Sequence, residues 1–154
     1  MDLSDAEVLD LLRRALDGDT NAIAELAAVG NVRLFEAWHG GARPALIVPR
    51  DGVISLLRGM LDRTVSPGHA RDWAFFVRHG HLGSWSRTPI AGDATGVIER
   101  AEATVFGEEL PIDWEPSFED QINETTFRLD EIGDSVDGIV TDEEIRDFLR
   151  KLSG

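Results

Sequence analysis

Apolar residues recur every three or four positions along most of this chain, with polar residues between them. This spacing places the apolar side chains on one face of an α-helix, so it predicts amphipathic helices. The predicted helices lie between Ser4 and Gly18, between Asp19 and Gly30, over residues 51–61 and 67–79, from Ser117 to Val136, and from Thr141 to Leu152. Because most connections between them are short, the pattern favours an antiparallel assembly.

Local signals at the helix ends support these boundaries. Ser4 with Glu7, and Thr141 with Glu144, can each form a capping box, in which both side chains bind backbone N–H groups of the first turn. Gly133 lies near the end of the longest predicted helix and weakens its last turn by up to about 1 kcal/mol.

Residues 31–50 show a less regular spacing of apolar residues than the predicted helices do. Two short apolar runs, Val32 to Trp38 and Ala45 to Pro49, flank a segment that contains Gly40 and Gly41. Such an arrangement is typical of a small β-hairpin, although an irregular loop is the alternative. The predicted fold class is therefore mainly α, an antiparallel helix bundle with one small β-hairpin near residues 31–49.

The segment 81–116 is rich in glycine and proline and is the least regular part of the chain. One helix is predicted inside it, from Asp93 to Phe106, with Val97, Ala101 and Val105 as its apolar positions. At 154 residues the whole chain, 1–154, is long enough for a single domain with its own core.

The charge of the chain is strongly acidic and unevenly distributed. The sequence has 29 Asp and Glu against 15 Lys and Arg, a formal net charge of −14. Residues 108–154 hold 15 acids and 4 bases, a balance of −11, whereas residues 1–107 hold 14 acids and 11 bases, a balance of −3. Such a field attracts cationic partners and repels nucleic acid and anionic membranes. We therefore expect a basic protein partner, and neither nucleic acid nor a membrane.

Composition also bears on the compartment. The chain has no cysteine, so it forms no disulfide and has no thiol nucleophile or thiolate metal ligand. Its first residues are acidic, unlike a secretion signal, and no apolar run approaches the roughly 20 residues that span a bilayer. We therefore expect a cytoplasmic protein, a monomer, without a cofactor.

The longest predicted helix carries an unusual outer face. With Phe118 at the centre of the buried seam and about 100° per residue, Phe127 falls on the opposite side. Around Phe127 lie Asp120, Asn123, Glu124, Glu131 and Asp134. A large aromatic residue inside an acidic rim is typical of a binding hot spot for a basic partner. The alternative is that Phe127 packs against the Gly/Pro-rich middle segment. Trp114, between Asp113 and Glu115, would extend the acidic and aromatic surface.

Two segments of the sequence are alternative candidates for metal sites. The segment from Asp137 to Glu144 matches the second half of an EF-hand calcium loop, but the first and third ligand positions would be Gly133 and Ser135. A turn followed by a capping box explains the same residues without a metal, so a calcium-responsive binding module is the weaker hypothesis.

The second metal hypothesis is a zinc-dependent hydrolase that uses His79 and His81, with Asp72 on the preceding helix. No HExxH or comparable ligand spacing is present, and a histidine near a helix C-terminus commonly interacts with the helix dipole. Nucleophile, phosphate-loop and dinucleotide-binding motifs are also missing from the sequence. The sequence therefore gives no support to an enzyme.

Two stretches together resemble a known family. The first runs from Val65 to Arg78 and contains Asp72-Trp73-Ala74; the second contains Phe127-Arg128-Leu129-Asp130-Glu131-Ile132-Gly133-Asp134, Asp137-Gly138 and Thr141-Asp142-Glu143-Glu144. They resemble the self-protective, colicin D type of bacterial immunity proteins. The similarity covers roughly residues 52–80 and 112–152. It makes residues 51–154 an immunity-like helical core with an irregular insertion near 81–110, and residues 1–50 an N-terminal extension.

The resemblance implies a helical antitoxin that protects a toxin-producing cell. Such proteins bind the nuclease domain of the toxin, a tRNA-cleaving domain for the colicin D type, and block its active site with acidic side chains that replace substrate phosphates. Carried onto this chain, the toxin-binding surface would be the face from Asp120 to Asp134, together with Asp137.

Overall fold

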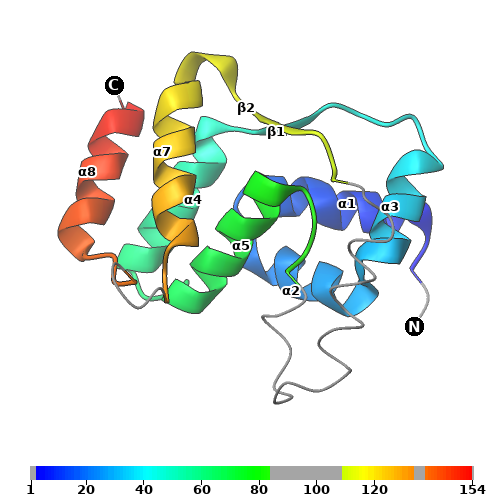
Figure 1. Ribbon diagram of the computed structural model, residues 1–154, viewed down its shortest axis with the longest axis horizontal. Helices are drawn as coiled ribbons and strands as arrows, with labels where there is room; N and C mark the ends of the chain where they lie inside the picture. The colour runs from blue at the N-terminus through cyan, green and yellow to red at the C-terminus, as the bar shows by residue number, and fades with distance from the viewer. Residues whose placement is uncertain (1–2, 84–108, 134–137, 154) are drawn as a thin grey trace.

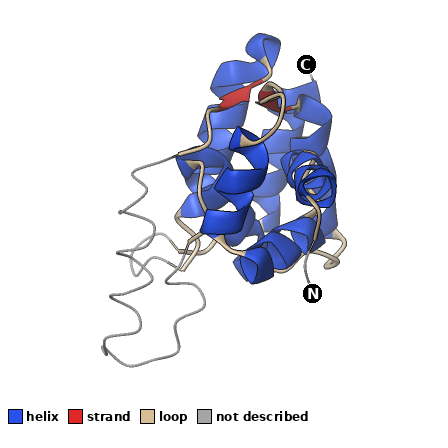
Figure 2. Cartoon of the chain, turned by 90° about the vertical axis from the view of Figure 1, so that its right-hand side faces the viewer, coloured by secondary structure: helices blue, strands red, loops and turns tan. Residues whose placement is uncertain are grey.

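The computed structural model describes residues 3–83, 109–133 and 138–153, and these are mainly helical (Figure 1). The helices are α1 (Asp5–Leu16), α2 (Thr20–Val29), α3 (Asn31–His39), α4 (Arg50–Leu61), α5 (Pro67–His79), the 3₁₀ helix η2 (Pro116–Phe118), α7 (Glu119–Asp130) and α8 (Asp142–Ser153). Two three-residue strands, β1 (Leu46–Val48) and β2 (Ile112–Trp114), complete the described elements. Figure 2 shows the strands as two short segments among helices.

The helix boundaries near the N-terminus follow the predicted caps. The Ser4 and Glu7 capping box is formed, and the Asp19 side chain accepts hydrogen bonds from the first backbone N–H groups of α2. Gly30, with φ of 92°, ends α2 and at once precedes α3. Since this left-handed φ suits glycine, the chain can turn there and place α3 against both α1 and α2.

The predicted β-hairpin near residues 31–49 is wrong. Residues 31–39 form α3, whose buried residues are Leu34, Phe35 and Ala37. The later apolar run does form a strand, β1, but it pairs with β2 in parallel, with Leu46 opposite Ile112 and Val48 opposite Trp114. A parallel pair needs a long crossover, so its partner lies far along the chain. A run as short as 32–38 fits the period of a helix as well as that of a strand, so its apolar pattern does not separate the two structures.

The remaining helices assemble around α5. In Figure 1, α1, α2 and α3 lie at one end of the molecule and α7 and α8 at the other, with α5 between them. α5 contacts α2 on one side and α7 on the other, while α8 packs against α4 and α7. Trp73 of α5 is fully buried, and its indole N–H donates to the carbonyl of Ala15, 2.7 Å away. Residues of α1–α3 thus share one continuous core with the later helices.

Two glycines bring the α1–α2 turn directly against the start of α4. Gly18 has φ of 92°, and a Cβ built on it would collide with the carbonyl oxygen of Gly52. A Cβ built on Gly52 would lie 2.8 Å from the backbone carbon of Asp17. Both positions therefore require a residue without a side chain.

The helix predicted from Ser117 to Val136 is shorter than expected. Pro116 begins the 3₁₀ turn η2, α7 itself begins at Glu119 without a side-chain cap, and it ends at Asp130. Gly133, with φ of 91°, then donates its N–H to the carbonyl of Gly138 at 3.0 Å, which turns the chain toward α8. The glycine therefore ends the helix region instead of only weakening its last turn.

Some predicted features lie outside the described residues, namely the helix from Asp93 to Phe106 and the site residues Asp134 and Asp137. Among the residues that are described, no helix is both long and apolar enough to cross a lipid bilayer.

Candidate functional site

The outer face of α7 has the exposure that the helical periodicity predicts. Phe127 is 55% exposed, and Asp120, Asn123 and Glu124 are exposed beside it, whereas Glu131 is half-buried. The opposite seam, made of Ile122, Thr125, Leu129 and Ile132, is buried against the rest of the molecule. An exposed phenylalanine of this kind is therefore a surface feature and not part of the core.

Arg78 of α5 reaches the same face. Its guanidinium carbon lies 5.0 Å from the centre of the Phe127 ring, which is within cation–π range. The guanidinium also donates to the backbone carbonyl and the side-chain oxygen of Asn123, both at 3.1 Å, and to the Thr126 hydroxyl at 3.2 Å. Asn123 and one side of Phe127 are thus held by α5, a contact that the sequence reasoning missed because 45 residues separate Arg78 from Asn123.

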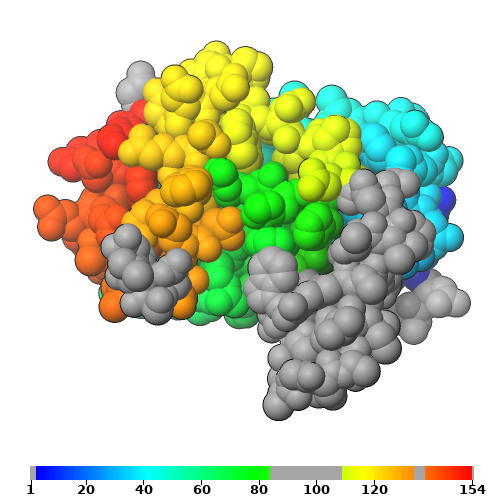
Figure 3. Space-filling model, viewed as in Figure 1, coloured from blue at the N-terminus to red at the C-terminus, as the bar shows by residue number. Residues whose placement is uncertain are grey.

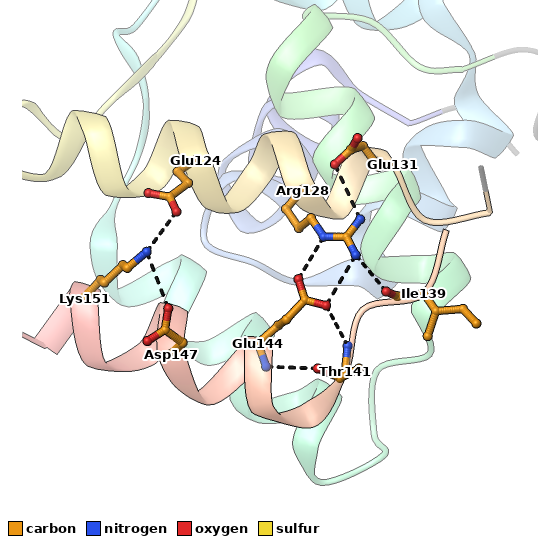
Figure 4. A network of polar contacts seen from close by, with 8 residues as sticks. All are labelled: Glu124, Arg128, Glu131, Ile139, Thr141, Glu144, Asp147 and Lys151. Atoms are coloured by element: carbon orange, nitrogen blue, oxygen red, sulfur yellow. Dashed lines mark hydrogen bonds and ion pairs between the residues drawn. The ribbon is translucent and has the colours of Figure 1, made fainter. Parts of the chain in front are cut away.

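Figure 4 shows that two of the predicted partner-binding carboxylates are engaged within the molecule. Glu124 accepts a hydrogen bond from the ammonium group of Lys151 at 2.9 Å, and Asp147 lies 3.5 Å from the same ammonium. The bond to Glu124 raises the pKa of Lys151 above its ordinary value. Both side chains of this pair are exposed to solvent, which screens the attraction between them.

The second engaged carboxylate belongs to a larger network around Arg128. The guanidinium binds both oxygens of Glu144, at 2.9 and 3.3 Å, donates to the carbonyl of Ile139 at 2.8 Å, and lies 3.5 Å from Glu131. The hydrogen bond from Arg128 lowers the pKa of Glu144, and in return raises the pKa of Arg128. We call Arg128, Glu131, Ile139 and Glu144 the α7–α8 clamp, because they hold these two helices and the turn between them together (Figure 4).

The clamp also bears on the calcium hypothesis. The predicted capping box is formed, with Glu144 N–H donating to the Thr141 hydroxyl at 3.2 Å and Thr141 N–H donating to the Glu144 carboxylate at 3.3 Å. Glu144 would be the last ligand of an EF-hand loop, yet its carboxylate faces a guanidinium. This placement gives the calcium hypothesis no support.

The histidines of the zinc hypothesis have other contacts. His79 Nε2 lies 3.2 Å from a carboxylate oxygen of Asp130, and His81 Nδ1 lies 3.1 Å from the carbonyl oxygen of Leu82. Asp72 lies beside Arg71 at 3.4 Å. Within residues 3–83, 109–133 and 138–153, no group of three or more His, Cys, Asp or Glu is placed to hold a metal ion.

Some carboxylates of the acidic C-terminal third lie outside these ion pairs. In the part of the chain that the structure describes, four exposed carboxylates between residues 109 and 120 take part in no ion pair: Glu109, Asp113, Glu119 and Asp120. We call them the 109–120 carboxylates. They follow the chain through β2 and η2 into the first turn of α7, and in Figure 3 the yellow residues of these elements cover one continuous part of the visible face.

Of the 109–120 carboxylates, only Asp120 belongs to the surface predicted from the sequence. The exposure of Asp113 could have been predicted from the alternation of side chains in a strand. In β2, Ile112 and Trp114 are half-buried on one face, and Asp113 between them is exposed on the other. Trp114 itself packs partly against the core, so it supports the strand that displays Asp113 and offers only part of its ring to a partner.

Comparison of the chain with protein-family models, with curated proteins and with solved structures found no match in any of the three. The resemblance to colicin D type immunity proteins therefore stays a prediction made from the quoted residues.

Proposed function

We propose that this chain is an immunity protein, which binds a cognate bacterial toxin in the cytoplasm and blocks its basic nuclease domain. The observation that carries the proposal is the localised negative charge. Residues 108–154 have a balance of −11, from 15 acids and 4 bases, and within them the 109–120 carboxylates are exposed and outside ion pairs among the described residues.

The chemistry of a nuclease explains why such a surface inhibits it. A nuclease cleft is basic because it holds substrate phosphates, so exposed carboxylates can take the positions of those phosphates. The same charges steer association, which can reach about 10⁸–10⁹ M⁻¹s⁻¹ at low salt. The tRNA-cleaving class is favoured by the family resemblance alone.

Charge does not by itself give a long-lived complex, since a desolvated carboxylate needs a cationic partner in return. Phe127 supplies an apolar contact on the same helix as Asp120, and Arg78 fixes one side of its ring. Because Arg78 is itself cationic, we place the charge contacts at the Asp113 and Asp120 end of the surface and the apolar contact at Phe127.

The test mixes the chain with the nuclease domain of the toxin encoded beside its gene and follows cleavage of tRNA. One equivalent of the chain is expected to abolish cleavage. The double variant Asp113→Lys with Asp120→Lys should weaken inhibition about 100-fold, since each close charge pair at an interface contributes roughly 1.5–7 kcal/mol.

The matched control replaces Glu36 and Asp62, two exposed carboxylates without ion pairs in the described part of the chain, by lysine. Both double variants change the net charge equally, so only the position differs. Inhibition by the control should stay within about threefold of the parent chain. The proposal fails if no complex forms at micromolar concentration, or if both double variants lose inhibition equally.

A further inference from the structure

The hairpin of α1 and α2 carries an open groove of about 750 Å³ on its surface. Its apolar lining consists of Leu3, Ala6, Leu11, Ala28 and Val29, and its charged lining consists of Glu7, Asp10, Arg14 and Glu25. All of these side chains belong to α1, α2 or the residue just before the capping box of α1. The groove is therefore separate from the 109–120 carboxylates.

The shape of the groove follows from small residues at its two walls. Ala6 of α1 and Ala28 of α2 are both exposed and leave the trough between the helices open, whereas Arg14 of α1 and Glu25 of α2 approach each other to 4.0 Å. The lining residues on α1 run from Ala6 to Arg14, which corresponds to roughly 12 Å along a helix axis. A groove of that length accommodates about two turns of a partner helix.

The charges on the lining favour a cationic occupant. Three carboxylates, Glu7, Asp10 and Glu25, stand against the single guanidinium of Arg14. Arg14 is hydrogen-bonded to Asp19 at 2.9 Å and lies 4.0 Å from Glu25, so it neutralises part of the negative charge of the lining. With the neighbouring Asp19 and Arg13 included, four carboxylates stand beside two guanidinium groups, and the balance stays negative. Hydrogen bonds from Ser4 lower the pKa of Glu7, which keeps that carboxylate ionised. Asp10 also pairs with Arg13, at 3.0 Å.

We propose that the α1–α2 groove is a docking site for an amphipathic helix of a partner protein, with an apolar stripe flanked by lysine or arginine. The stripe covers the apolar lining, and the basic flanks meet the carboxylates of the lining, as in other helix-in-groove complexes. A second copy of this chain is a poor occupant, because a net charge of −14 brings repulsion to an acidic rim. This proposal does not rest on the toxin-binding one.

The test uses a synthetic 16-residue helical peptide with leucines at spacings of three and four and lysines on both flanks of that stripe. Amide shifts of the ¹⁵N-labelled chain are followed during titration, and they should change in α1 and α2. Two variants of the groove, Ala28→Arg and Glu25→Lys, should each raise the dissociation constant at least tenfold. Both sites are exposed on α2, so helix content and melting temperature serve to confirm that the variants fold.

Two controls separate the groove from general charge attraction. Asp62→Lys makes the same charge change as Glu25→Lys at the exposed end of α4, and it should alter the dissociation constant less than twofold. A peptide with glutamate in place of lysine should not bind. The proposal is overturned if millimolar peptide leaves α1 and α2 unshifted, if the shifts map to α7 and β2, or if Asp62→Lys weakens binding as much as Glu25→Lys. A dimer of the chain that Ala28→Arg dissociates would also overturn it, by making a second copy the occupant.

Discussion

At the residue scale, Gly52 fixes how closely the α1–α2 turn approaches α4. Replacing it by alanine places a Cβ 2.8 Å from the backbone of Asp17, where neither main chain can yield without moving a helix. Overpacking of this kind costs about 1–3 kcal/mol, so Gly52→Ala should lower the free energy of unfolding by that amount. Urea denaturation, followed by the helical circular dichroism signal, measures the change.

Gly68 provides the matched control for that substitution. It lies in the first turn of α5, and a Cβ built there meets no atom within 4 Å. Because alanine loses less backbone entropy on folding than glycine, Gly68→Ala should be neutral or stabilise the chain by up to about 1 kcal/mol. A Gly52→Ala variant as stable as Gly68→Ala would show that the α1–α2 turn is not packed against α4 as described.

At the scale of elements, Arg128 is the residue that joins α7, α8 and the turn between them. Replacing it by methionine keeps much of the side-chain volume but removes the hydrogen bonds to Glu144 and Ile139. Bonds to a charged group contribute roughly 1.5–3 kcal/mol, and the exposure of Glu144 reduces this, so the expected loss is about 1–2 kcal/mol at pH 7. Urea denaturation at a series of pH values measures it.

The same substitution has a defined pH dependence. The pKa of Glu144 is lower in the folded chain than its ordinary value of 4.5, so the pair stabilises the fold above that pH. This contribution is lost as the pH falls through the lowered pKa of the folded state. The difference in the free energy of unfolding between the parent chain and Arg128→Met should therefore have its full value near pH 7 and become smaller below about pH 4.5. Arg146→Met, on the exposed face of α8, is the control and should change little at any pH. A difference that stays constant down to pH 3 would argue against the clamp.

Elements could be predicted from sequence where their signals are local. The capping boxes of α1 and α8, the stop at Gly30 and the exposure of Phe127 follow from spacing within one helix. Contacts between elements could not be predicted in this way. β1 pairs with β2 across more than sixty residues, and Arg128 is hydrogen-bonded to Glu144 across a turn. The periodicity within one segment carries no information about a partner in another segment. The exposure of Asp120, Glu124 and Phe127 on α7 follows from the helical period, while the contacts of Glu124 and Glu131 with other elements do not.

At the scale of the whole molecule, the excess of carboxylates acts on stability as well as on binding. Surface ion pairs occupy many of the bases, so the 109–120 carboxylates are left to repel one another and the rest of the acidic chain. Salt shortens the range of that repulsion, because the Debye length falls from about 30 Å at 0.01 M to about 10 Å at 0.1 M. Salt also weakens the exposed pairs, but each of these contributes only about 0–1 kcal/mol.

Repulsion should therefore dominate, and raising NaCl from about 10 mM to 100 mM should stabilise the chain by about 1 kcal/mol, which raises the melting temperature by about 2–4 °C. The double variant Asp113→Asn with Asp120→Asn should melt higher at low salt and respond less to added salt. Glu36→Gln with Asp62→Asn removes two carboxylates from the less acidic part of the chain and should respond like the parent. A melting temperature that falls with salt would mean that the ion pairs outweigh the repulsion. Since the same field attracts a basic partner, that outcome would also weaken the case for electrostatic steering.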